Sequence, residues 1–248
     1  MMGLDASRIR AVIRKELRDY RRKRSIIAGM IILPTLFLVE PVVTIFLISG
    51  STSGSSLDGY VVFPLLYLLL IPVVTPSTLA AYTVVGEREQ GTLEPLLTTP
   101  IRRQELILGK AAAVMIPTLA LSYLVFGLFL GAVVLFASSA VASAVFRQGP
   151  VLLAMVLFSP LLAAWAIAVG MAVSVRASEV RVAQQLGMLA SLPPVSLIAL
   201  LAFGVISPTF PVAVLFAAAL LTIDVIAIRI ISGMFDRERL VTGAKATH

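Results

Sequence analysis

The chain lacks cysteine, and charged residues and histidine are scarce in it. Of its 248 residues, 13% are charged and 59% are hydrophobic, and the mean hydropathy is +1.01. A soluble domain usually carries about a quarter charged residues, so this composition excludes a protein that faces water on all sides. The lack of cysteine excludes a disulfide framework, a thiolate nucleophile and a cysteine zinc site. The only histidine is His248, the last residue, so no Ser/His/Asp set and no metal-ligand spacing is present.

A nucleotide-binding loop is missing as well. The only Gly-Lys pair is Gly109-Lys110, and Gln104 stands where a phosphate-binding loop requires glycine, five positions before Gly109. We therefore expect this chain to bind no cofactor or metal and to have no catalytic residue of its own.

Long apolar runs dominate the rest of the chain. A run of about 20 residues, at 1.5 Å per residue, crosses a hydrocarbon core of roughly 30 Å. These runs lack the alternation of barrel strands, so they predict an all-α integral membrane protein that forms a single transmembrane domain over 1–248. The six predicted spans cover about 25–48, 60–85, 111–137, 150–175, 179–201 and 211–231.

Lysine and arginine are concentrated in alternate connecting segments. With the N-terminus inside, segments 8–24, 86–110, 176–184 and 229–248 hold nine, four, two and four of them, which is 19 of 20. Inner loops of membrane proteins are enriched in these residues. The pattern therefore predicts a multi-pass protein with both termini in the cytoplasm. We expect it in a prokaryotic cell membrane. The net charge of +7 is then a topology signal that requires no nucleic acid, with anionic lipid as its counterion.

The segment before the first span is amphipathic. Apolar residues between Ile9 and Tyr20 recur at helical spacing, and arginines occupy the other positions. This pattern predicts a helix over 5–24 that lies in the inner interface of the membrane. The alternative is that these basic residues only enforce orientation.

Prolines punctuate the region between the fifth and sixth spans. Pro193-Pro194, Pro208 and Pro211 are residues at which helices stop or bend. Composition allows a continuous fifth span with a tight turn, or a shorter span followed by a re-entrant hairpin over about 200–211.

Two carboxylates fall within predicted spans. Glu40 and Asp224 are candidate intramembrane sites, because an acid buried in lipid is costly unless it is paired, protonated or hydrated. Their predicted depths differ by about 12 Å, which argues against a direct pair. Either residue could meet a substrate. The structural alternative is that Glu40 lines a hydrated cavity or reaches the outer interface and Asp224 bonds a neighbouring helix.

The charged stretch GEREQGTLEPLLTTPIRRQELILGK, over 86–110, interrupts the apolar chain. Thr92 is a suitable helix cap, with Glu94 and Pro95 in the first turn, where both are favoured. Leucines 93, 96 and 97 then form an apolar edge, so the pattern predicts a short amphipathic helix at the inner face. Thr99-Pro100 starts a second helix that continues into the third span.

This stretch resembles the loop between the second and third spans of ATP-binding cassette (ABC) exporter permeases of the type-two family. The segment VIRKELRDYRRKRS resembles that family's N-terminal interfacial helix. The resemblance implies a homodimeric, non-catalytic membrane subunit on which separate ATPase subunits, carrying ATP and magnesium, dock. It also favours the hairpin over 200–211. The implied ATPase-contact residues of this coupling loop are Glu87, Arg88, Glu89, Gly91, Thr92, Leu93, Glu94, Leu96 and Leu97, with a second contact at Glu179 and Arg181.

Two other classes of function remain open at this stage. One is an ion-coupled secondary transporter or channel that uses Glu40 or Asp224. The other is a non-transporting membrane scaffold that recruits a partner through 86–110. No feature of the sequence specifies a cargo.

Overall fold

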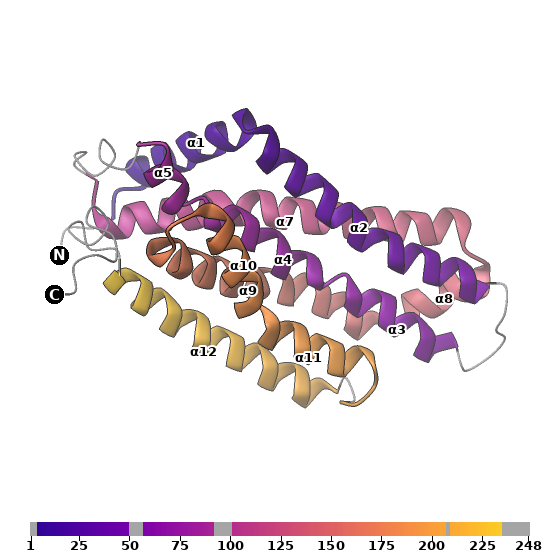
Figure 1. Cartoon of the computed structure of the whole chain (residues 1–248). Coiled ribbons are helices and arrows are strands. Elements are labelled where there is room, and N and C mark those ends of the chain that lie inside the picture. The colour runs from indigo at the N-terminus through magenta and orange to yellow at the C-terminus, as the bar shows by residue number, and fades with distance from the viewer. Residues whose placement is uncertain (1–3, 50–56, 92–100, 207–208, 235–248) are drawn as a thin grey trace.

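The structure is a computed structural model that describes residues 4–49, 57–91, 101–206 and 209–234. Within these ranges the chain is helical and contains no strand. The long helices run side by side as one bundle, with α1 crossing one of its ends (Figure 1). The helices are α1 (Ala6–Arg22), α2 (Arg24–Ser49), α3 (Leu57–Tyr67), α4 (Leu70–Ala81), α5 (Val85–Glu89), α7 (Arg103–Phe136), α8 (Ser139–Arg147), α9 (Gly149–Arg176), α10 (Val180–Ala190), α11 (Leu192–Ala202) and α12 (Phe210–Met234).

The predicted all-α membrane fold is confirmed. Five helical segments of the described chain are long and apolar enough to cross a membrane, and a bent pair, α10 with α11, makes up to six. Each predicted span overlaps one of these segments. The five are Ile26–Leu47, Leu57–Glu89, Arg103–Phe136, Gly149–Arg176 and Phe210–Ile231.

Two of the spans are broken near prolines. The α3–α4 segment turns at Leu68 and Leu69, because Pro72 has no N–H to donate to the carbonyl of Leu68. Instead, the N–H of Ile71 donates to that carbonyl at 3.2 Å. The α10–α11 pair bends by 40° at Ser191, because Pro193 and Pro194 have no N–H to donate to the carbonyls of the preceding turn.

The sequence left one connection open and missed another. Between the fifth and sixth spans, α11 ends at Ala202, a turn follows and α12 begins at Phe210, so the described residues there agree with the turn and show no hairpin. Gly204 forms that turn with φ of 72°, a conformation that glycine adopts without strain. The short helix α8 between the third and fourth spans was not predicted, although Ser138, whose hydroxyl accepts from the N–H of Val141, is its sequence signal.

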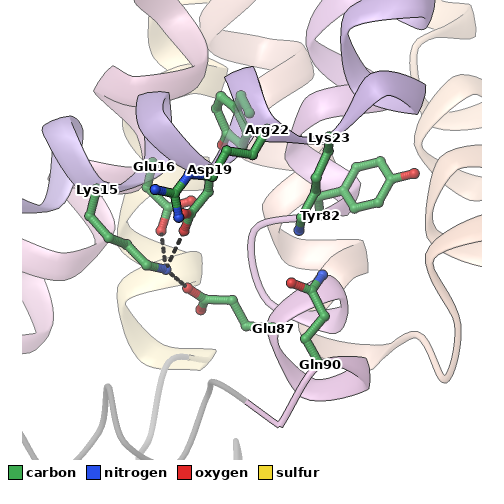
Figure 2. Close-up of a pocket in the computed structure, with 9 residues that line it drawn as sticks. Lys15, Glu16, Asp19, Arg22, Lys23, Tyr82, Glu87 and Gln90 are labelled. Carbon is green, nitrogen blue, oxygen red and sulfur yellow. Dashed lines mark hydrogen bonds and ion pairs between the residues drawn. The ribbon is translucent and has the colours of Figure 1, made fainter.

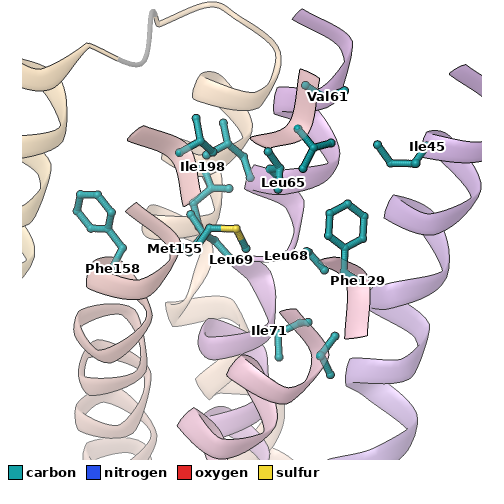
Figure 3. Packing of buried hydrophobic residues seen from close by; sticks show 14 of the residues in the cluster. Ile45, Val61, Leu65, Leu68, Leu69, Ile71, Phe129, Met155, Phe158 and Ile198 are labelled. Carbon is teal, nitrogen blue, oxygen red and sulfur yellow. The ribbon is translucent and has the colours of Figure 1, made fainter. Parts of the chain in front are cut away.

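The helices α4 and α9 form the centre of the bundle. About half of each span lies inside the protein, whereas α2, α7 and α12 are mostly exposed. A Cβ added to Gly170 of α9 would lie 2.5 Å from the Cβ of Ala80, so the glycine permits close approach to α4. An apolar cluster fills the bundle away from the end where α1 and α5 lie. It joins α2, α3, α7, α9 and α11 through Ile45, Leu65, Phe129, Met155 and Ile198 (Figure 3).

Candidate functional site

Lys110 of α7 is the centre of a buried group of charges at the end of the bundle where α1 and α5 lie. Its side chain is 1% exposed, and its Nζ lies 2.9 Å from Oε1 of Glu16 and 2.8 Å from Oε2 of Glu87. It also donates to the carbonyl of Thr83 at 2.7 Å. Lys15 contacts both carboxylates from the other side, at 3.2 Å from Glu16 (Figure 2). We call Lys15, Glu16, Glu87 and Lys110 the lysine–carboxylate cluster.

The charges of this cluster stabilise one another. Burial alone would raise the pKa of Glu16, but Lys110 and Lys15 outweigh it and hold that pKa below its usual value. Burial alone would lower the pKa of Lys15, but Glu16 and Glu87 outweigh it and raise that pKa. Both residues are therefore charged at neutral pH, and the cluster connects α1, α5 and α7 by charge-assisted contacts.

Arg88 and Glu89, next to Glu87 on α5, hold two further helices. The guanidinium of Arg88 donates to the carbonyls of Val175 and Ala177 at 3.2 and 3.1 Å. Carbonyls at a helix C-terminus lack helical partners, so Arg88 satisfies the end of α9. Glu89 accepts the N–H of Val180 at 2.9 Å, which caps the start of α10.

Ser174 of α9 holds the bend between α4 and α5. Its hydroxyl accepts the N–H groups of Val84 and Val85, both at 3.1 Å, and donates to the carbonyl of Ala81 at 2.7 Å. The residue is fully buried. No pattern in the sequence marks this serine, because its partners lie about 90 positions away.

Glu105 attaches the start of α1 to α7. It is 0% exposed, and its carboxylate accepts the N–H of Arg102 at 2.9 Å and that of Asp5 at 3.0 Å. The guanidinium of Arg8 lies 3.6 Å away. The bond to Arg102 belongs to a capping box, a local pattern. The bond to Asp5 bridges 100 positions and has no sequence signal.

The structure brings the two predicted contact segments together. Glu89 accepts from Val180, so it lies beside Glu179 and Arg181, and all three side chains are exposed. Glu87, by contrast, is 6% exposed inside the lysine–carboxylate cluster. The other predicted contacts are Arg88, which is half-buried, Gly91, which is exposed with φ of 67°, and five residues outside the described ranges: Thr92, Leu93, Glu94, Leu96 and Leu97.

The two intramembrane carboxylates lie apart. Glu40 of α2 is half-buried, and one of its oxygens accepts the hydroxyl of Thr44 at 2.7 Å. Asp224 of α12 is 5% exposed, and neither of its oxygens has a hydrogen-bond partner among the described residues. The predicted bond from Asp224 to a neighbouring helix is therefore absent from the described structure.

A polar pocket of about 250 Å³ opens between α1 and the segment around α5, next to the lysine–carboxylate cluster (Figure 2). The ammonium of Lys23 lies 5.6 Å from the ring centre of Tyr82 at this pocket, a cation–π geometry. Burial raises the pKa of Tyr20, so its hydroxyl stays protonated. The lining residues are Lys15, Glu16, Asp19, Tyr20, Arg22, Lys23, Tyr82, Glu87 and Gln90.

The apolar helices and the charged site at one end define a multi-pass membrane protein whose connecting segments are tied to its spans. Comparison with family models is more specific. The model described as ABC-2 family transporter protein matches residues 10–217, which is most of the chain, so the chain belongs to that family. It is therefore an ABC transporter permease, from a family of membrane components that associate with ABC ATPase subunits and are generally non-catalytic themselves. A comparison with curated proteins found no match.

Proposed function

We propose that this chain is the membrane-spanning subunit of an ATP-driven exporter in a prokaryotic cell membrane. ATP and magnesium bind a separate ATPase subunit, and this chain binds neither. Two copies of the chain enclose the pathway, and both termini lie in the cytoplasm. The family membership supports the transporter class, and the charge distribution of the connecting segments supports the orientation.

The observation that carries this proposal is the attachment of α5. Glu87 connects it to α1 and α7, Arg88 to the end of α9, and Glu89 to the start of α10. A force applied to α5 therefore reaches four neighbouring helices besides α4, to which the bend at 82–84 joins it. The contacts of Glu87 are buried and resist separation, and those of Arg88 and Glu89 are charge-assisted, so a displacement of α5 is passed to these helices.

The docking surface for the ATPase follows from the same geometry. The exposed side chains of Glu89, Glu179 and Arg181 lie together. Residues 92–97, which the sequence predicts as an amphipathic helix, follow α5 in the chain. Complementary charges on the partner give such a surface its specificity, and the leucines of that helix supply the buried anchor area.

Copurification tests the docking surface. The tagged full-length chain is coexpressed with the ATPase and purified, and the bound ATPase and its hydrolysis rate are measured. We expect Leu97→Asp to lose the bound ATPase, because a charge replaces an anchor. Arg147→Ala, on a side chain that pairs with Asp58 at the other end of the bundle, is the control. Wild-type binding and hydrolysis by Leu97→Asp would refute the assignment.

The absence of cysteine makes orientation directly testable. Single cysteines are placed at Ser143 on α8 and at Ser178 between α9 and α10, both of which are exposed. A membrane-impermeant maleimide should label the first in intact cells and the second only after permeabilisation. The reverse pattern would refute the orientation. For direction, ATP added outside inside-out vesicles should drive cargo into them.

A further inference from the structure

Four arginines form a stripe along the outer face of α1. Arg10, Arg14, Arg18 and Arg21 are all exposed, and none has a hydrogen bond or ion pair within the described part of the chain. At 3.6 residues per turn, they lie about 120–160° around the helix from Glu16, which is buried. The arginine stripe therefore faces away from the lysine–carboxylate cluster and from α5.

The acids of α1 do not neutralise this stripe. Glu16 is held by Lys110 and Lys15, and Asp19 lies 3.4 Å from Lys15. Asp5 accepts from Ser7 at the N-terminus of the helix. Within the part of the chain that the structure describes, the positive charge of the stripe is therefore uncompensated on that face.

The path of α1 places the stripe beside the membrane surface. Only Lys23 separates α1 from α2, and the apolar span begins at Ile26, about 7.5 Å of helix beyond Arg21. The contacts of Asp5 with Glu105 and of Glu16 with Lys110 give the slope of α1.

That slope is shallow. Asp5 and Glu16 are eleven residues apart, about 16.5 Å along α1. Their partners Glu105 and Lys110 are only five residues apart, about 7.5 Å along α7. The oblique crossing of α1 over the start of α7 is visible in Figure 1. Because α7 crosses the membrane, this distance along α7 measures the change in membrane depth along α1, which is about 7.5 Å. The headgroup layer is roughly 5–7.5 Å thick on each side, so α1 stays close to it.

We propose that the arginine stripe of α1 binds the headgroups of anionic phospholipids. Guanidinium groups pair with phosphate in two-point geometry, and a row of them along an interfacial helix fits a negative membrane surface. An ATPase is the less suitable occupant, because the stripe points away from α5 and the proposed docking surface. The inference goes beyond the transport function and does not depend on the cargo.

Lipid-dependent stabilisation of the purified full-length chain tests the proposal. In detergent, Tm is measured while phosphatidylglycerol or phosphatidylcholine is added. An arginine near an anionic surface contributes about fivefold in binding, so Arg14→Gln with Arg18→Gln should raise the half-saturating phosphatidylglycerol concentration by about 25-fold. The lipid-free Tm should not change, because both side chains are exposed and have no ion pair or hydrogen bond with the described residues. Phosphatidylcholine should show no difference between variant and wild type.

The matched control replaces Arg176, an exposed arginine at the same end of the bundle, with glutamine and is compared with Arg14→Gln alone. It should keep the wild-type response. Arg14→Lys with Arg18→Lys preserves the charge but not the two-point geometry, so its loss should be smaller than that of the glutamine variant. Equal losses in the glutamine control and the stripe variant would refute a specific surface. If the stripe variant keeps its lipid response but loses the copurifying ATPase, the stripe docks a protein and the lipid assignment is wrong.

Discussion

Replacing Lys110 with methionine should destabilise the bundle strongly. The substitution leaves Glu16 and Glu87 without the buried ammonium that lies within 3 Å of both. Removal of one partner from a buried ion pair costs about 3–5 kcal/mol. Lys15 still contacts both carboxylates, so we expect the lower end, about 3 kcal/mol. For a chain of this size that lowers Tm by roughly 6–12 °C.

Circular dichroism of the detergent-purified protein during heating measures this loss. Replacing Glu16 and Glu87 with glutamine in the Lys110→Met background should recover most of it, because no buried carboxylate is then left unpaired and the partly exposed Lys15 still pairs with Asp19. Arg14→Met, on an exposed side chain that has no partner among the described residues, should stay within about 0.5 kcal/mol of wild type. A wild-type Tm for Lys110→Met, or no recovery in the triple variant, would refute the role of the cluster.

The same cluster predicts a pH dependence. Because the pKa of Glu16 is lowered from 4.5 in the folded chain, its contribution to stability is complete above that value and is lost as the pH falls through the lowered pKa. The Lys110→Met variant should lose part of this acid sensitivity. If the wild type and Lys110→Met lose stability over the same acidic pH range, Lys110 is not the cause of the lowered pKa of Glu16.

Three further substitutions follow from packing and hydrogen bonding. Gly170→Ala should destabilise by about 1–3 kcal/mol through overpacking, and Ala80→Gly in the same chain should restore most of that, since it removes the Cβ at 2.5 Å. Ser174→Ala leaves buried backbone groups at the α4–α5 bend unsatisfied and should lower stability by about 1–3 kcal/mol, whereas Ser174→Thr, which keeps the hydroxyl, separates that loss from packing. Asp224→Leu should raise Tm, because the carboxyl is buried without a partner in the described structure; a lower Tm would reveal a partner for it. Thermal unfolding measures all three.

Much of the fold was predictable from the sequence. Apolar runs of span length, the concentration of lysine and arginine in alternate segments, and the 3.6-residue pattern before the first span are local properties, because each reflects how a short segment partitions between lipid and water. The similarity of the stretch 86–110 to a known family is likewise contained in consecutive residues, and the family match over 10–217 agrees with it.

The sequence determined the connections least well. It left two courses open for 200–211 and did not predict α8, because the course of such short segments depends on the helices beside them. Prolines indicate that a helix ends or bends, but they do not specify where the chain goes next.

Only the tertiary structure determined the partners of the charged residues. The sequence marked Glu87 as a contact for another protein, yet it lies in a buried cluster with Lys110 and Glu16. Lys110 lies 23 positions from Glu87 and 94 from Glu16, and Lys15 lies 72 positions from Glu87. No local pattern encodes which lysine meets which carboxylate. The reason is physical: composition and spacing specify that a segment is helical and where it partitions. The pairing of a buried charge depends on which helices pack together, since only that packing removes the charge from water and makes a partner necessary.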